Sequence, residues 1–237
     1  MRFEKGRAQI SSALRLKHNE SDFYYAPGDR RIHKGWVTVK RDREGLGADV
    51  ELFAMLMERG ASEREMHKFV EEHPAILTEA RLGIPISHRP RFVEPPNNEP
   101  DFLLSPILGP WENKAVEILE LKGPAEKTLR TGPHPGFSAK VTWAVDQVRD
   151  YDRYLRDPVN ITAVLQGLGY LPDDSKLAVL IGRAPKSDAE REVWAQRQDK
   201  LDVKIVTYDE ILAKQAAHLQ DSHPYRVLSG TPGYPLK

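Results

Sequence analysis

Two short stretches of the chain decide its fold, and they read Pro-Asp-Phe-Leu-Leu-Ser at residues 100–105 and Val-Glu-Ile-Leu-Glu-Leu-Lys at residues 116–122. Apolar residues dominate both, and a connection with proline and glycine separates them, so we expect two strands that pair as a hairpin. In the predicted register Asp101 faces Glu120. Because side chains alternate along a strand, Lys122 lies on the same face as Glu120.

Two carboxylates and an ammonium group at the end of an apolar hairpin are costly unless they serve one another or a ligand. Mg²⁺ takes oxygen ligands, typically one or two carboxylates with water and substrate phosphate completing the shell. A lysine beside it can hold a water molecule or neutralise charge that develops on a phosphate. Asp101, Glu120 and Lys122 therefore point to metal-assisted phosphodiester hydrolysis. The alternative is that the Glu-x-Lys pair lies on a solvated strand face.

A helix is expected downstream, with Ser138 as its N-cap and Leu155 near its end. Its apolar residues follow the helical period at positions 141, 144, 145, 148, 151 and 155. Gln147 and Tyr151 are four residues apart and therefore share a face. The alternative to a site at this face is one exposed glutamine and one core tyrosine.

A second helix is expected upstream, within residues 62–77. Ser62 and Glu65 form a capping box at its start. A proline follows His73, so the helix should end near that histidine.

These motifs resemble the PD-(D/E)xK nuclease superfamily, with Pro100-Asp101 and Glu120-Leu121-Lys122 as the two halves of its signature. The pair Gln147-x-x-x-Tyr151 resembles the additional motif of RecB-like nucleases. The Glu-Glu-His-Pro sequence at 71–74 and a strand–helix ending around Tyr208 extend the likeness. In this order the motifs resemble the Shedu-type nuclease domain of bacterial anti-phage defence proteins, over about residues 62–214.

The resemblance implies roles for the residues of the signature. Asp101 and Glu120 would ligate Mg²⁺ or Mn²⁺, with the Leu121 carbonyl as a third protein oxygen. Lys122 would orient the attacking water or stabilise the pentavalent phosphorus.

The resemblance also implies roles for residues on the two helices. Gln147 would position Lys122 or a phosphate, and Tyr151 would support Gln147. A glutamate from the first helix joins the site in related nucleases, which points to Glu72, with Glu71 as the second choice. Solvated helix-end charges are the alternative for both glutamates.

The composition fits a soluble enzyme of the cytoplasm. The chain has 237 residues, of which 30% are charged, and no cysteine, which excludes disulfides, Cys-ligated zinc and iron–sulfur clusters. No apolar run could span a membrane and no signal peptide is visible, so we expect no membrane partner. Thirty-five Lys and Arg balance thirty-five Asp and Glu, so DNA binding requires a local basic groove. Four cations flank the signature: Lys122, Lys127, Arg130 and Lys140.

The expected fold class is α/β, a restriction-endonuclease-like PD-(D/E)xK core in which helices flank a mixed sheet with an antiparallel hairpin. We predict three parts: a β-rich N-terminal arm or subdomain (1–48), the nuclease-like domain (49–220) and an extended tail (221–237). Within the domain, the strand–helix–strand–helix order after residue 176 predicts a parallel crossover.

Smaller elements are also predicted from the local pattern. We expect a helix over 49–59 that ends at Gly60. The stretch 123–137 is a long loop without elements of its own, which suits a substrate-edge or lid role.

The sequence therefore predicts a Mg²⁺- or Mn²⁺-dependent endonuclease that acts on DNA, and the resemblance implies anti-phage defence and a homo-oligomer. Only about sixty residues precede the nuclease-like part, so we expect a companion defence or regulatory protein to supply activation control. The alternative is a non-catalytic nuclease-fold module for DNA binding or assembly. An acid/base hydrolase that uses Asp101 and Glu120 without metal ranks behind both.

Overall fold

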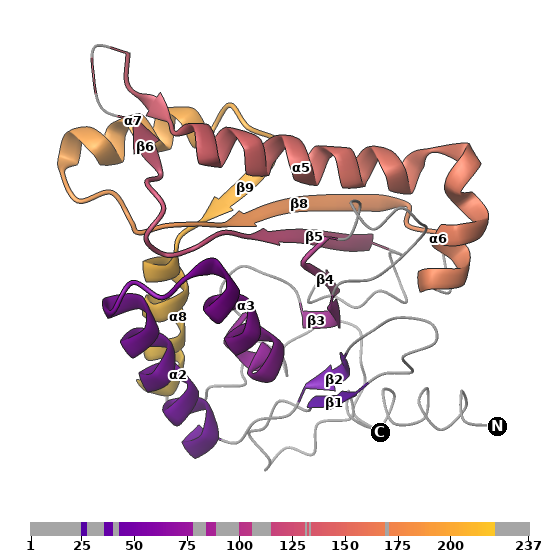
Figure 1. Ribbon diagram of the computed structural model, residues 1–237, viewed down its shortest axis with the longest axis horizontal. Helices are drawn as coiled ribbons and strands as arrows, with labels where there is room; N and C mark the ends of the chain where they lie inside the picture. The colour runs from indigo at the N-terminus through magenta and orange to yellow at the C-terminus, as the bar shows by residue number, and fades with distance from the viewer. Residues whose placement is uncertain are drawn as a thin grey trace.

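The computed structural model describes residues 25–27, 36–39, 43–77, 84–88, 100–105, 115–130, 132, 134–168 and 171–220. Helices cover both faces of a twisted sheet in an α/β arrangement (Figure 1), as the sequence predicted. None of the helices in these segments is long and apolar enough to cross a membrane. The predicted C-terminal tail and most of the predicted N-terminal arm lie outside the described residues.

The main sheet has five strands in the order β3 (Ile84–His88), β4 (Phe102–Ser105), β5 (Ala115–Leu121), β8 (Asp174–Leu180) and β9 (Val203–Val206). β3, β4 and β5 are antiparallel neighbours, whereas β5, β8 and β9 run parallel. Both the predicted hairpin and the predicted parallel crossover are therefore confirmed.

The predicted register of the β4–β5 hairpin is also confirmed. Phe102 pairs with Leu119 and Leu103 with Ile118. Continued by one position, this register sets Asp101, the residue before β4, opposite Glu120. The alternation of side chains along β5 directs Ile118 and Glu120 to one face of the sheet and Leu119 to the other.

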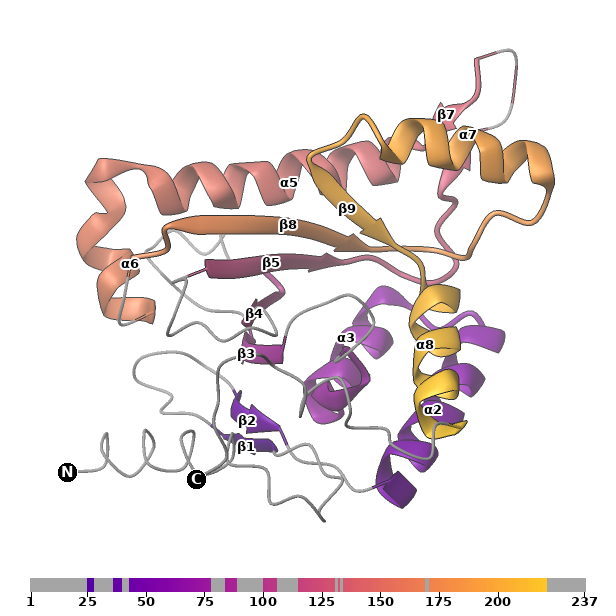
Figure 2. The same ribbon diagram turned by 180° about the vertical axis from the view of Figure 1, so that it is seen from behind.

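Two apolar cores lie on the two faces of the sheet. One face packs against the long helix α5 (Ala139–Arg156), whose inner side includes Val141, Ala144 and Val148. The other face packs against α2 (Arg43–Glu58), α3 (Glu63–Glu72) and α8 (Tyr208–Gln220), as Figure 2 shows from behind. Ile118 belongs to the α5 core and Leu119 to the other, so Glu120 lies on the α5 face at the end of β5.

Local capping explains where the helices begin and end. Ser62 caps α3 and forms the predicted capping box with Glu65, and His73 is the C-cap. Ser138 caps α5 through its hydroxyl, which accepts from the Val141 amide at 3.3 Å. Both predicted helices are thus confirmed with their caps.

The helix predicted over 49–59 begins six residues earlier, because α2 starts at Arg43. Glycines at 45 and 47 lower the helix propensity there. Tertiary packing outweighs that cost, since Leu46 is fully buried in the core. Gly60 ends this segment with φ +69°, as predicted.

The remaining elements complete the part of the chain that the structure describes. A separate antiparallel pair, β1 (Tyr25–Pro27) with β2 (Trp36–Val39), belongs to the predicted N-terminal arm. α6 (Ile161–Leu168) and α7 (Asp188–Gln198) flank β8 in the chain, and two short 3₁₀ turns occur at Pro74–Leu77 and Pro158–Asn160. The division into arm, domain and tail stays a prediction.

The stretch after β5, which we predicted to be a loop, contains a small hairpin. Its strands are β6 (Leu129–Arg130) and β7 (Gly136–Phe137). The Ser138 amide donates to the Thr128 carbonyl at 3.0 Å and closes the base of this hairpin. Strands of two residues are too short to leave a periodic signal in the sequence.

Candidate active site

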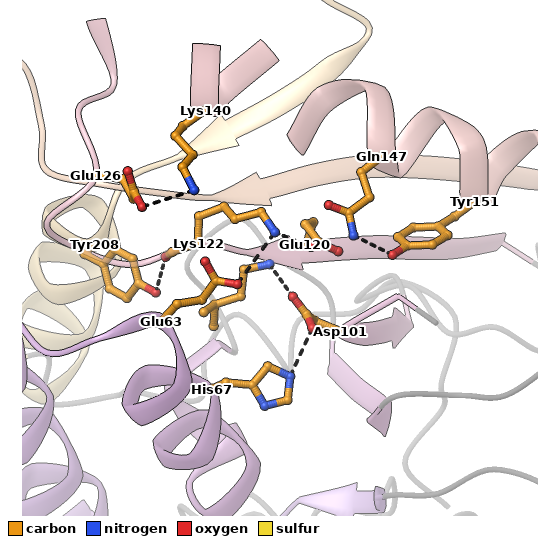
Figure 3. Close-up of polar contacts among 11 residues, drawn as sticks. Glu63, His67, Asp101, Glu120, Lys122, Glu126, Lys140, Gln147, Tyr151 and Tyr208 are labelled. Carbon is orange, nitrogen blue, oxygen red and sulfur yellow. Dashed lines mark hydrogen bonds and ion pairs between the residues drawn. The ribbon is translucent and has the colours of Figure 1, made fainter. Parts of the chain in front are cut away.

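Asp101 is held at the end of β5 by two contacts from different elements (Figure 3). Its Oδ2 accepts a hydrogen bond from the backbone amide of Leu121 at 2.9 Å. Its Oδ1 lies 3.1 Å from Nε2 of His67 on α3. The carboxylate is therefore fixed beside the Glu-Leu-Lys segment of β5, as the hairpin register predicted.

Glu120 and Lys122 form a close pair on the same face of the strand. The Lys122 Nζ donates to Oε1 of Glu120 at 2.7 Å. The second oxygen, Oε2 of Glu120, is buried and has no hydrogen-bond partner among the described residues. Glu120 is only 2% exposed. A buried carboxylate oxygen without a partner is unusual, because the loss of its hydration is then uncompensated.

Burial raises the pKa of Glu120 to about 8, and the carboxylate of Asp101 adds to this effect, while Lys122 opposes it. Burial also acts to lower the pKa of Lys122. Glu120, Glu63 and Asp101 outweigh that effect, so the pKa of Lys122 is raised. Lys122 is therefore an ammonium group at neutral pH.

Glu63, and not Glu72, is the α3 glutamate that the structure brings to the site. Its Oε1 lies 3.7 Å from the Lys122 Nζ. A methyl group placed on Gly123 would lie 3.3 Å from the Glu63 backbone nitrogen, so the start of α3 packs directly against the end of β5.

The sequence pointed to Glu72, but the structure does not bring this residue to Lys122. Glu72 lies at the other end of α3, about 13 Å further along the helix axis. Its carboxylate is more than half exposed and lies 3.7 Å from Lys68. Glu71, the second choice, lines the hollow described below.

His67 is a site residue that the sequence analysis missed. It is one helical turn after Glu63, so both side chains lie on the face of α3 that meets the sheet. Its ring stacks on Phe102 with centroids 4.9 Å apart, which orients the imidazole toward Asp101. The spacing of Glu63 and His67 on a capped helix was the only available signal, and it is common in helices.

Gln147 and Tyr151 lie along α5, as expected (Figure 3). The Gln147 Nε2 donates to the Tyr151 hydroxyl at 2.7 Å. No contact from Gln147 to Lys122 is seen among the described residues, so the positioning role predicted for Gln147 stays a prediction.

Tyr208 fixes the backbone at the end of β5. Its hydroxyl donates to the Lys122 carbonyl at 2.7 Å, and the Lys122 amide donates to the Leu180 carbonyl at 2.8 Å. Burial, with Glu63 and Asp101 adding to it, raises the pKa of the Tyr208 hydroxyl, so it stays a donor. Lys122 is thus held at the point where β5 leaves the sheet.

A surface hollow of about 550 Å³ opens beside these groups. Its walls include Glu63, His67 and Asp101, with the cations Arg64 and Lys68 at the rim. A phosphate group would find carboxylates, an imidazole, one guanidinium and one ammonium group within one hollow.

The donor set fits a hard divalent cation. The described residues hold no cluster of three Asp, Glu or His side chains arranged to bind a metal. Mg²⁺ usually takes one or two carboxylates and keeps several waters. Asp101 and Glu120 supply two carboxylates, and Oε2 of Glu120 is a buried oxygen that still lacks a partner. Glu63 adds a third carboxylate on the other side of Lys122.

A comparison with models of protein families gives a match. A family model described as "Shedu protein SduA, C-terminal" matches residues 60–212, about two-thirds of the chain. The matched region begins at Gly60 before α3 and ends within α8, so it includes every site residue described above. No curated protein matches the chain significantly.

Proposed function

Because the chain belongs to the family of the Shedu protein SduA C-terminal domain, we propose that it is a metal-dependent endonuclease that hydrolyses DNA phosphodiester bonds in anti-phage defence. The observation that carries this proposal is the Asp101, Glu120 and Lys122 cluster at the end of β5. Among the described residues, Oε2 of Glu120 is buried without a hydrogen-bond partner, while the Lys122 ammonium group lies 2.7 Å from Oε1.

The topology supports assignment of the domain to the PD-(D/E)xK fold. The β4–β5 hairpin carries the two halves of the signature, and β8 and β9 extend the sheet in parallel with β5. α5 covers the face on which Glu120 lies. This arrangement sets the acidic groups at one edge of the sheet, where a nucleic-acid backbone can reach them.

Asp101 and Glu120, with the Leu121 carbonyl, are the proposed ligands of Mg²⁺ or Mn²⁺. When bound, the cation would polarise the scissile phosphate and make a water molecule more acidic. Asp101 needs little rearrangement for this role, because the Leu121 amide and His67 already fix its orientation.

Lys122 acts in this proposal as a cation and not as a general base. Its raised pKa keeps the ammonium group protonated at neutral pH. It can donate hydrogen bonds to the attacking water and to a phosphate oxygen on which charge develops. Glu63, 3.7 Å from the ammonium group, is the carboxylate placed to accept a proton from that water.

Cleavage of supercoiled plasmid and of linear duplex DNA tests the proposal. The purified protein is incubated with Mg²⁺, Mn²⁺ or EDTA, beside Glu120→Ala, Lys122→Ala and the surface control Asp188→Asn, whose side chain is 97% exposed. We expect cleavage that requires metal, is lost in the first two variants and is retained in the control.

A different pattern would favour the non-catalytic module. In that case neither wild type nor any variant would cleave DNA with either metal, while wild type and Glu120→Ala would bind DNA equally. Cleavage in EDTA that depends on Glu120 would instead favour acid/base hydrolysis without metal.

From the same family membership we propose that the protein works as a homo-oligomer with DNA as its partner, under control by a companion defence protein. Sedimentation velocity of the purified chain, with and without duplex DNA, tests the first two points. A monomer at all concentrations would contradict the oligomer.

A further inference from the structure

A second hollow, of about 290 Å³, lies between the β6–β7 hairpin and the C-terminal end of α7. Both ribbon views show this hairpin beside α7, near the start of α5 and away from α2, α3 and α8 (Figures 1 and 2). The hollow is therefore separate from the one beside Asp101, although both are reached from the segment that leaves β5.

Three cations line this hollow: Arg130, Arg197 and Lys200. No carboxylate lines it among the residues that the structure describes. Arg130 lies on β6, whereas the other two lie some seventy residues later in the chain, so only folding brings the three together.

The two arginines converge on one point of the hairpin. A methyl group placed on Gly136 would lie 3.5 Å from Nε of Arg130 and 3.6 Å from Nε of Arg197. Like charges this close repel each other unless an anion lies between or beside them. Gly136 leaves the space in which both guanidinium groups fit.

The arrangement is held by contacts other than ion pairs. The Arg197 Nη2 donates to the Pro135 carbonyl at 3.0 Å, which ties α7 to the hairpin. Phe137 and Trp194 meet edge to face with centroids 5.4 Å apart, beneath the same contact. The guanidinium group of Arg197 is thus oriented before any ligand arrives.

Arginines elsewhere on the surface of the described chain behave differently. Arg149, Arg153, Arg156 and Arg191 each lie within ion-pair distance of a carboxylate. Arg130 and Lys200 have no such partner among the described residues. No carboxylate of the described residues therefore competes with a ligand for Arg130 or Lys200 in this hollow.

The hairpin is anchored close to the proposed catalytic strand. Gly123, the first residue after Lys122, accepts from the Gly182 amide at 3.2 Å through its carbonyl. From there the chain runs directly into β6. A nucleic-acid strand that crosses the end of β5 can continue along the hairpin toward α7.

We propose that this basic hollow binds a backbone phosphate of the DNA at a distance from the bond that is cut. Guanidinium groups bind phosphate oxygens through two parallel hydrogen bonds, and such contacts position the duplex without reading its sequence. This inference rests on the proposed function only in taking DNA as the ligand.

Binding of fluorescent duplex DNA, measured by anisotropy in EDTA over a range of salt concentrations, tests the inference without cleavage. Arg130→Gln, Arg197→Gln and Lys200→Gln are compared with Arg153→Gln, an exposed arginine on α5 that is paired with Asp150. Thermal unfolding of each variant checks that it is folded. Arg197→Gln can disturb the contact with Pro135. Lys200→Gln tests the inference without touching that contact.

For each of the three variants we expect affinity for DNA to fall roughly tenfold, the size of one lost charge-assisted hydrogen bond. The slope of log affinity against log salt should also become smaller by about one. Arg153→Gln should match wild type.

Two results would overturn the inference: the three variants bind DNA as the control does, or wild type binds no DNA. A third result would also overturn it, namely that inorganic phosphate binds through Arg130 in calorimetry while DNA affinity is independent of Arg130. The plasmid assay tests the proposed nuclease activity independently. If Glu120→Ala loses cleavage while Arg130→Gln binds DNA as wild type does, the proposed nuclease function is supported and only the inference about this hollow is wrong.

Discussion

The carboxyl group of Glu120 lies at the boundary between an apolar sheet and a charged cluster. It follows Ile118 on the buried face of β5, so strand geometry forces it inward. Lys122 reaches one oxygen and nothing reaches the other in the described chain. Burial and Asp101 then favour the protonated acid in the metal-free protein.

This protonation makes stability depend on pH. Between roughly pH 5 and pH 8 the folded protein keeps a proton on Glu120 that the unfolded chain, with a carboxyl pKa near 4.5, has released. The folded state binds more protons, so the free energy of unfolding should fall as pH rises, by at most about 1.4 kcal/mol per pH unit. Urea unfolding of wild type in EDTA, at several pH values, measures this slope.

Glu120→Gln supplies the comparison, because the amide can still accept from Lys122 but cannot release a proton. We expect this variant to be more stable than wild type near pH 8 and to lose most of the slope. Asp188→Asn, the surface control, should show the same pH slope as wild type. An unchanged slope in Glu120→Gln would show that another group titrates.

The two ends of α3 give a matched test of which glutamate acts in the site. Glu63→Gln should lower kcat/KM for DNA cleavage by about 100- to 10,000-fold, the range for a group that accepts a proton in the reaction. Glu72→Gln should change it less than twofold, since its carboxylate lies 3.7 Å from Lys68 and is exposed. Equal losses in both variants would contradict the geometry.

At the scale of elements, the site depends on three junctions with the end of β5. The start of α3 packs on Gly123, Tyr208 at the start of α8 holds the Lys122 carbonyl, and the β6–β7 hairpin leaves from the same point. The first two junctions join elements that are distant in sequence. The local signals of the hairpin and the caps fix the elements, while these junctions fix their relative positions.

Gly182 is where the base of the β6–β7 hairpin meets the end of β8. It has φ +60°, and a methyl group there would lie 2.4 Å from the Glu126 carbonyl oxygen and 2.6 Å from a Thr128 methyl. Gly182→Ala should therefore destabilise the protein by about 3 kcal/mol or more, through backbone strain and displacement of the hairpin base. Thermal or urea unfolding measures the loss.

Gly60→Ala is the matched control for backbone strain alone. Gly60 has φ +69°, but no atom lies within 4 Å of an added methyl group. We expect a loss of about 1 kcal/mol, which is the cost of a left-handed non-glycine residue. Equal losses at the two positions would mean that the contact with Glu126 is readily relieved.

At the scale of the whole molecule, two apolar cores pack on the two faces of the sheet, and the charged groups of the site lie at the end of β5 between them. The α5 core and the α2–α3–α8 core meet at β5, whose alternate residues belong to each. Acidic groups at the end of this strand repel one another, so a bound cation should stabilise the fold as a whole.

Metal binding should therefore raise the melting temperature. At a concentration ten times its Kd, Mg²⁺ or Mn²⁺ would add about 1.4 kcal/mol to the free energy of unfolding. The gain should increase with pH up to about 8, because Glu120 must lose its proton to bind the ion. Differential scanning calorimetry with metal and with EDTA measures the shift. A full shift in Glu120→Ala would exclude this carboxylate as a ligand.

The sequence by itself determined the parts of the fold that depend on local periodicity. The alternation of apolar residues and the charges at 101, 120 and 122 predicted the β4–β5 register, and Ser62 and Ser138 predicted the starts of α3 and α5. These signals are local because hydrogen bonds of strands and helix caps connect residues at fixed spacing. The roles of the predicted site residues stay predictions.

Only the tertiary structure decided which distant side chains meet. The sequence pointed to Glu72, whereas the packing of α3 on Gly123 brings Glu63 to Lys122. Packing also sets His67 beside Asp101. In the same way the fold gathers the three cations of the second hollow: Arg130, Arg197 and Lys200. Such proximities arise from the way apolar faces bury one another, and residue spacing along the chain does not encode them.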